Sequence, residues 1–347
     1  MKIETVLGQI DSDKLGIIAP HEHLFIDTTF EAQEPKDEES RELFYSDVSI
    51  NNIDVLRRNP FLVKDNMVLE DLDTAIYEIN RLKKVGVSTI VDLTNIGIKR
   101  NLKKIQEVSK RTNVNIIAGC GLYTGLTVPE EYAKQDVDSL ARWMINEIRE
   151  GEAETGIKPG VIGEIGTSET VEPLEEKSLR AAAFANLETG LPIYIHTYPW
   201  SCASLDAIDI LIKEGVHPEQ ICICHLDVAF NYEYLCKVFD RGVYAMFDNF
   251  GKEYYFPKVD AVFSGGPFET DLDRVRMIIR MIKENRTDQL MLATDVCLKS
   301  LLHSFGGWSY DHIFTNISVM MENEGISQEN IEKLLYVNPT RFICSRR

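Results

Sequence analysis

The sequence predicts an α/β protein built as a single-domain (β/α)8 barrel, the TIM-barrel fold, over residues 1–347. Eight short apolar segments alternate with amphipathic segments of helical periodicity, and such a barrel has eight strands. The apolar segments do not alternate polar and apolar residues, which is typical of parallel strands covered on both faces. The length of 347 residues suits one large barrel, and no internal repeat, low-complexity tract or linker marks a domain boundary.

The predicted strands are short and rich in isoleucine, valine and other apolar residues. They cover residues 16–20, 87–93, 114–120, 160–165, 191–196, 220–225, 243–248 and 290–295. Between them, apolar residues recur every three or four positions, as in residues 71–85, where Gly86 is suited to end a helix. Further helices are predicted for residues 138–150, 205–214 and 273–285. The alternative, an open doubly wound sheet, lacks a glycine-rich dinucleotide motif after the first strand.

Two connections that follow predicted strands are unusually long. They are residues 28–65 after the first strand and residues 249–272 after the seventh. In a barrel, such connections lie at the C-terminal ends of the strands, where barrel enzymes place their active sites. We therefore expect the functional residues at that end.

The composition argues against several classes of function. A formal net charge of −18 disfavours nucleic acid and anionic membranes as partners. No apolar run approaches the roughly 20 residues of a membrane span. The seven cysteines are odd in number and lie mostly in apolar segments, so we expect reduced thiols and a cytoplasmic location. Cys222 and Cys224 could form half of a metal site, but their spacing and the lack of a second pair favour a structural role.

Two histidines follow the first predicted strand. In an extended chain, residues two positions apart face the same side, so His21 and His23 can grip one divalent metal. Alone, this pair is a weak signal, because surface histidines are common.

Four other predicted strands also end in side chains that bind metals. These are Glu164, His196, His225 and Asp295, at the ends of the fourth, fifth, sixth and eighth strands. Singly, each histidine could be a hydrogen-bonded core residue and the aspartate a helix cap, but a buried carboxylate is costly without a partner. Six such side chains at matching strand ends suit two divalent ions about 3.5–4 Å apart with a carboxylate between them.

These residues, with their neighbours, resemble the phosphotriesterase family of the amidohydrolase superfamily over essentially the whole chain. The matching segments are Thr5-Val6-Leu7-Gly8, Pro20-His21-Glu22-His23-Leu24, Gly163-Glu164-Ile165-Gly166, Ile195-His196, Cys224-His225-Leu226-Asp227, Thr294-Asp295 and Val337-Asn338-Pro339. The resemblance implies a metal-dependent hydrolase with two divalent ions. Zinc is the expected metal, with manganese, cobalt or nickel as alternatives.

The resemblance also assigns the ligands. His21, His23 and Asp295 would bind the more buried ion, and His196 and His225 the more exposed one. Organophosphate-hydrolysing members bridge their metals with a carbamylated lysine on the fourth strand. Here Glu164 takes that place, as in the phosphotriesterase-homology and phosphotriesterase-related branches. A glutamate supplies both oxygens directly, so assembly should not need carbon dioxide.

The implied chemistry is hydrolysis by a hydroxide held between the metals, with the scissile carbonyl or phosphoryl oxygen on the exposed metal. Asp295 would be the catalytic residue that accepts the proton of this hydroxide and passes it to the leaving group.

Candidate substrate-binding residues lie on the connections at the same end. Tyr123 follows the third strand, where related enzymes place an aromatic residue beside the metals, and it could equally be an ordinary half-buried tyrosine. The segment with Lys252 and Tyr255 resembles the substrate loop of the family. Two or three of the cations on or near these connections could bind a phosphate, sulfonate or carboxylate, or each could be a solvated surface cation; they are Lys252, Arg274, Arg276 and Lys299.

These features favour a small ester, lactone or N-acyl amide that carries an anionic group. Two alternatives stay open: an organophosphate or phosphotriester hydrolase, and a non-catalytic metal-binding barrel. The expected partner is a small-molecule substrate, and the sequence leaves a homodimer open.

Overall fold

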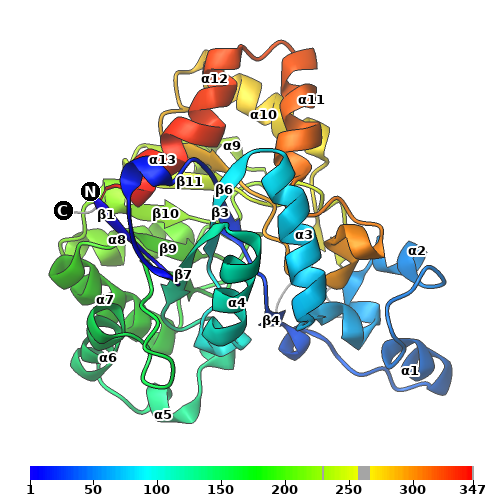
Figure 1. The fold of residues 1–347 in the computed structure, drawn as a ribbon, viewed down its shortest axis with the longest axis horizontal. Helices are drawn as coiled ribbons and strands as arrows, with labels where there is room; N and C mark the ends of the chain where they lie inside the picture. The colour runs from blue at the N-terminus through cyan, green and yellow to red at the C-terminus, as the bar shows by residue number, and fades with distance from the viewer. Residues whose placement is uncertain (229, 257–265, 346–347) are drawn as a thin grey trace.

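The chain forms the predicted (β/α)8 barrel in a computed structural model that describes residues 1–228, 230–256 and 266–345 (Figure 1). Its parallel strands lie side by side in the order β14, β11, β10, β9, β8, β7, β6 and β3. Just beyond β14, the backbone N–H of Asp295 donates to the carbonyl of His21 at 3.2 Å, which brings the two ends of the sheet together. The strands are β3 (Ile17–Glu22), β6 (Val87–Asp92), β7 (Asn115–Cys120), β8 (Val161–Gly166), β9 (Ile193–His196), β10 (Ile221–Ile223), β11 (Tyr244–Phe247) and β14 (Leu290–Leu292).

Helices surround the barrel (Figure 1). The four predicted helices are confirmed, each within two residues at both ends. Polar side chains cap the N-termini of α3, α6 and α10; in α3, for example, Asp71 accepts from the backbone N–H of Thr74. The helices are α1 (Glu38–Phe44), α2 (Ile53–Leu56), α3 (Leu72–Lys84), α4 (Leu102–Thr112), α5 (Glu130–Ala133), α6 (Val137–Glu150), α7 (Pro173–Thr189), α8 (Ser204–Lys213), α9 (Tyr232–Phe239), α10 (Asp271–Lys283), α11 (Ser318–Asn323), α12 (Gln328–Glu332) and α13 (Asn338–Ile343).

An N-terminal hairpin precedes the barrel and was not predicted. Strands β1 (Lys2–Thr5) and β2 (Gly8–Asp11) pair antiparallel. The backbone N–H of Val6 donates to Ile116 in β7, which ties the hairpin to the barrel wall. The hairpin has few buried positions, so the sequence carries little apolar signal there.

Alternate residues of the strands point inward and pack as a cluster. Cys222 and Cys224 belong to this cluster and are fully buried. On the same cluster, Phe342 of α13 packs against the rings of Tyr194 and Tyr244, with ring centroids 5.0 and 4.8 Å apart. Most of the other buried apolar residues belong to two large clusters that join strand and helix side chains.

Both long connections fold over the C-terminal end of the barrel. The first holds α1 and α2 and is flanked by strands β4 (Ile26–Asp27) and β5 (Val68–Leu69), which pair with each other. The second holds the hairpin of β12 (Tyr255–Phe256) and β13 (Gly266–Pro267); residues 257–265 lie outside the described part.

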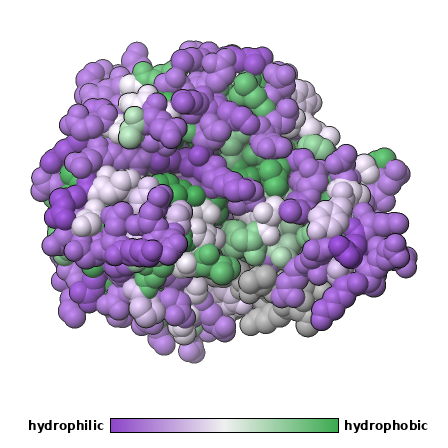
Figure 2. All heavy atoms as spheres, turned by 90° about the horizontal axis from the view of Figure 1, so that it is seen from below, coloured by the Kyte–Doolittle hydropathy of each residue, from purple (hydrophilic) through white to green (hydrophobic). Residues whose placement is uncertain are grey.

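The face in Figure 2 is largely hydrophilic, with hydrophobic residues gathered near its middle. In the part of the chain that the structure describes, no helix has the length and apolar character needed to cross a bilayer.

Candidate metal centre

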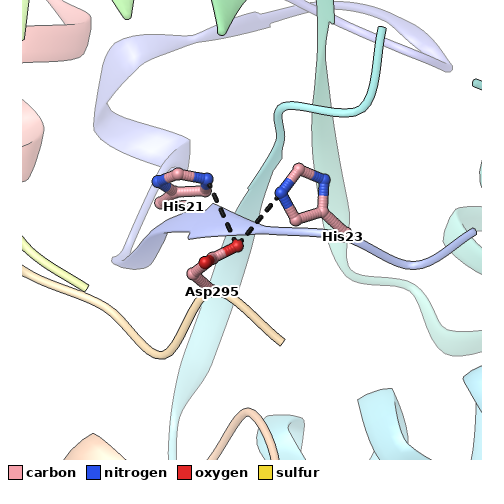
Figure 3. A group of neighbouring side chains, drawn as sticks. All are labelled: His21, His23 and Asp295. Carbon is pink, nitrogen blue, oxygen red and sulfur yellow. Dashed lines mark ion pairs between the residues drawn. The ribbon is translucent and has the colours of Figure 1, made fainter. Parts of the chain in front are cut away.

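Strands β3 and β14, at opposite ends of the strand order, position a first group of three candidate metal ligands (Figure 3). His21 lies in β3, His23 follows it, and Asp295 follows β14. The Oδ1 atom of Asp295 lies 3.5 Å from Nε2 of His21 and 3.1 Å from Nε2 of His23. All three residues are buried, and their donor atoms lie within 4.8 Å of one another.

A second group joins the ends of three neighbouring strands. Glu164 lies in β8, His196 ends β9, and His225 follows β10. The Oε2 atom of Glu164 lies 3.5 Å from Nδ1 of His196 and 3.4 Å from Nε2 of His225. The two imidazole nitrogens lie 2.9 Å apart.

The Glu164 carboxylate lies between the two groups. Besides its contacts in the second group, Oε2 lies 3.7 Å from Nε2 of His21 and Oε1 lies 3.5 Å from Nε2 of His23. The structure therefore brings together all six side chains that the sequence singled out, with Glu164 at the position expected of a bridge.

The polar atoms at this centre fit divalent ions. Nε2 of His21 and Oε2 of Glu164 are both buried and lack a hydrogen-bond partner. Buried polar atoms without a partner are costly, and a cation between an imidazole nitrogen and a carboxylate oxygen would satisfy both. Four imidazoles and two carboxylates are also a common donor set for zinc and related metals.

The electrostatics of the centre also favour a bound cation. Burial lowers the pKa of His23, but hydrogen bonding and the charges of Asp295 and Glu164 outweigh burial and raise the pKa to about 10. Burial also raises the pKa of the Glu164 carboxyl group, but four neighbouring histidines outweigh burial and hold this pKa well below its usual value. A protonated imidazole thus balances the carboxylates in the metal-free protein, and a bound cation would replace that proton.

Two of the six residues hold an unusual backbone conformation. His225 has φ 63° and Asp295 has φ 44°, in the left-handed region that side chains other than glycine seldom adopt. This corrects the predicted strands 220–225 and 290–295, because β10 ends at Ile223 and β14 at Leu292. With this backbone, both side chains contact the other candidate ligands.

Two buried carboxylates that the sequence did not single out support the candidate ligands. Asp248 follows β11 and contacts Nδ1 of both His21 and His225, at 2.9 and 3.0 Å. Burial raises the pKa of Asp248, but the two histidines hold it below the usual value. Glu22 accepts from the backbone N–H groups of Thr294 and Val296, which flank Asp295.

A third set of close donors contains a cysteine. His21, Cys224 and Asp248 place donor atoms within 4.8 Å of one another. Burial and neighbouring charges raise the pKa of the Cys224 thiol well above its usual value. Because metals bind the thiolate, Cys224 is a poor ligand here and acts as a packing residue.

A pocket opens beside the centre and encloses about 700 Å³, open solvent included. Tyr123 lines it, with its hydroxyl 2.9 Å from Nδ1 of His196. Lys252 also lines it and forms a buried ion pair with Asp295. Among the described residues that line the pocket, Lys252 is the only lysine or arginine.

Two other predicted substrate residues are placed differently. Arg274 is fully buried and pairs with Asp227 at 2.8 Å and Asp271 at 3.1 Å, and Lys299 pairs with Asp65. The described lining of the pocket contains neither cation. We therefore correct both expectations: each cation holds loops together. The side chain of Tyr255 lies outside the described part of the chain.

The sequence did not predict the apolar wall of the pocket. Four aromatic side chains form it: Phe61 from the first long connection, Trp200 from the connection after β9, and Tyr254 and Phe268 from the connection after β11. The ring of Phe268 lies 5.6 Å from that of Trp200 and 5.9 Å from that of Tyr254. No spacing rule could have linked them, because they meet only in the folded chain.

Comparison with known proteins agrees with this geometry. The chain matches the phosphotriesterase family over residues 1–343. The chain belongs to the phosphotriesterase family. It is 34% identical over 344 residues to the phosphotriesterase-related protein of Nematostella vectensis, and the aligned residues make up 98% of this chain and 97% of that protein. It is also 34% identical over 349 residues to the N-acetyltaurine hydrolase of Danio rerio, covering 99% of this chain and 97% of that protein.

A solved structure is similar over nearly the whole length. The resiniferatoxin-binding protein of Rhodobacter sphaeroides shares 31% identity and a TM-score of 0.94, over 99% of this chain and 94% of that chain. Together, the family and these relatives make this phosphotriesterase-family member a hydrolase with candidate metal-ligand groups at the C-terminal end of its barrel.

Proposed function

We propose that this hydrolase binds two divalent ions, and that it cleaves small N-acyl amides, lactones or carboxylic esters that carry an anionic group. One observation carries the proposal. The buried carboxylate of Glu164 lies within 3.7 Å of imidazole nitrogens from both ligand groups. One carboxylate shared by two ligand groups is the arrangement that holds two ions close together.

Each side chain then has a definite task. His21, His23 and Asp295 would hold the more buried ion, His196 and His225 would hold the other, and Glu164 would supply a carboxylate to both. Two bound ions, with zinc expected, would supply an activated water and polarise the scissile carbonyl group.

Asp295 is suited to move the proton. Its Oδ1 faces the imidazoles of the first group, while its Oδ2 contacts Lys252 on the pocket wall. We assign Asp295 as the base that accepts a proton from the attacking water and returns it to the leaving nitrogen or oxygen.

The pocket supports a substrate with one anionic and one apolar part. Burial lowers the pKa of Lys252, but the charge of Asp295 raises it above its usual value, so the ammonium stays charged. An ammonium has three donors, which allows Lys252 to keep its contact with Asp295 and also bind a sulfonate, carboxylate or phosphate. The aromatic wall would contact the apolar part. The relative named N-acetyltaurine hydrolase favours an amide as the bond that is cleaved.

A substrate panel on zinc-loaded protein tests this proposal. The panel contains N-acyl amino sulfonates, N-acyl amino acids, phosphorylated lactones and aryl phosphotriesters, and kcat/KM is measured for each. We expect the highest value for an anionic amide or lactone and about two equivalents of zinc per chain. A clear preference for neutral phosphotriesters would overturn the substrate class, and a protein without bound metal or activity would favour the non-catalytic barrel.

A further inference from the structure

Asp248 connects the two ligand groups through a single carboxylate. It is fully buried at the end of β11. Its Oδ2 lies 2.9 Å from Nδ1 of His21, and its Oδ1 lies 3.0 Å from Nδ1 of His225. His21 belongs to the first group and His225 to the second.

These contacts fix which nitrogen of each ring faces the centre. A carboxylate accepts hydrogen bonds, so each Nδ1 carries a proton, and in the neutral ring that a metal requires each Nε2 has the lone pair. Nε2 of His21 then lies 3.5 Å from Asp295, and Nε2 of His225 lies 3.4 Å from Glu164. Both inward nitrogens are thus ready to bind a cation.

The other two histidines have separate neighbours. Nδ1 of His23 lies 2.8 Å from the hydroxyl of Thr94, and His196 contacts the hydroxyl of Tyr123. Each of these hydroxyls is neutral and, among the described contacts, hydrogen-bonds to a histidine of one ligand group. Among the described residues, Asp248 is the one carboxylate that contacts the outer nitrogen of an imidazole in both groups.

We propose that Asp248 is a positioning residue shared by both metal sites, and that it sets the ring orientation and tautomer of one histidine in each. The proposal rests on the two-metal function above. A hydrogen-bonding partner of this kind typically changes metal affinity 10–100-fold.

The hydrogen bonds of Asp248 predict that Asp248→Asn and Asp248→Ala will affect metal binding differently. Its Oδ1 accepts three N–H groups: the backbone N–H of His225 at 3.0 Å, the side-chain amide of Asn249 at 2.9 Å and Nδ1 of His225. In Asp248→Asn the carbonyl oxygen belongs at this position, which leaves the amide NH2 facing His21. The amide then donates to Nδ1 of His21 and favours the tautomer with the ring proton on Nε2, which opposes metal binding at that nitrogen.

Zinc titration of the metal-free protein tests the proposal. Zn²⁺ is added in competition with a chromophoric chelator, and the number and affinity of the sites are fitted. We expect wild type to bind two equivalents tightly. Asp248→Asn should keep one tight site and weaken the other at least about 10-fold, and Asp248→Ala should weaken both.

Asp227→Asn is the matched control. Asp227 is a buried carboxylate in the same hydrogen-bond network: it accepts from the backbone N–H of Asp248 at 3.1 Å and from Asn249 and Arg274, and no described contact joins it to an imidazole. We expect this variant to keep two tight sites, and far-ultraviolet circular dichroism checks that each variant is folded.

Two results would overturn the role of Asp248 while leaving the two-metal function intact. One is that both Asp248 variants bind two equivalents with affinities within about threefold of wild type. The other is that Asp227→Asn loses zinc to the same extent, because the effect would then be structural. If wild type itself does not bind two equivalents, the proposed function fails instead.

Discussion

Replacing Arg274 with methionine tests whether this arginine stabilises the fold or binds the substrate. The guanidinium donates from Nε to Asp227 at 2.8 Å, from Nη1 to Asp271 at 3.1 Å and from Nη2 to the carbonyl of Lys252 at 3.2 Å. Both carboxylates and the guanidinium are buried. In Arg274→Met the two carboxylates lose their buried counter-charge, while the apolar stem is largely kept.

The expected loss of stability is large. Breaking a buried ion pair by removing one partner costs about 3–5 kcal/mol, because the remaining charge stays out of water. Arg276 is the matched control on the same helix: its side chain is 62% exposed and lies 3.6 Å from Asp273. Arg276→Met should change the free energy of unfolding by no more than about 0.5 kcal/mol.

Urea unfolding of zinc-loaded protein, followed by far-ultraviolet circular dichroism, measures both values. The structural role predicts a lower midpoint for Arg274→Met, with KM for an anionic substrate nearly unchanged in the protein that stays folded. A loss of stability below about 1 kcal/mol together with a large rise in KM would refute the reasoning and restore Arg274 as a substrate residue.

Four further predictions concern the metal centre and its pocket. Adding bicarbonate to metal-free protein with Zn²⁺ should not raise initial rates, because Glu164 supplies both oxygens; a clear bicarbonate requirement would exclude Glu164 as the bridge. Asp295→Asn should keep much of the metal but lower kcat by about 10²–10⁴, and full activity would remove Asp295 from the mechanism. Lys252→Met should raise KM for an anionic substrate about 10-fold or more, as expected for losing a charged hydrogen bond, with a smaller effect on a neutral ester. An equal effect on both substrates would show that Lys252 acts only through Asp295. Chelating the metal should lower the thermal midpoint, because an ion at 100 times its Kd stabilises the folded state by about 2.7 kcal/mol; identical midpoints with and without Zn²⁺ would argue against a bound metal.

The ligand set was predictable because it obeys a simple rule of barrels. Parallel strands covered on both faces are apolar runs, and the residues that end them meet at one rim. Glu164 and His196 stand out against such runs, and the structure places both at the centre. The strand boundaries near His225 and Asp295 were wrong because the left-handed backbone that ends each strand leaves no apolar or polar pattern.

The support around the ligands was harder to predict. Asp248 ends a predicted strand, so the same rule applies to it, but the resemblance assigns its segment to the substrate loop and not to the metal centre. For Arg274, the sequence shows a cation near the correct end of the barrel. It does not show that the buried carboxylate Asp227 would bind that cation first.

The most direct test of the two-metal centre is anomalous X-ray scattering from crystals of the zinc-loaded protein. The account predicts two zinc peaks about 3.5–4 Å apart, with the carboxylate oxygens of Glu164 between them. A single peak, or two peaks that Glu164 does not contact, would contradict it.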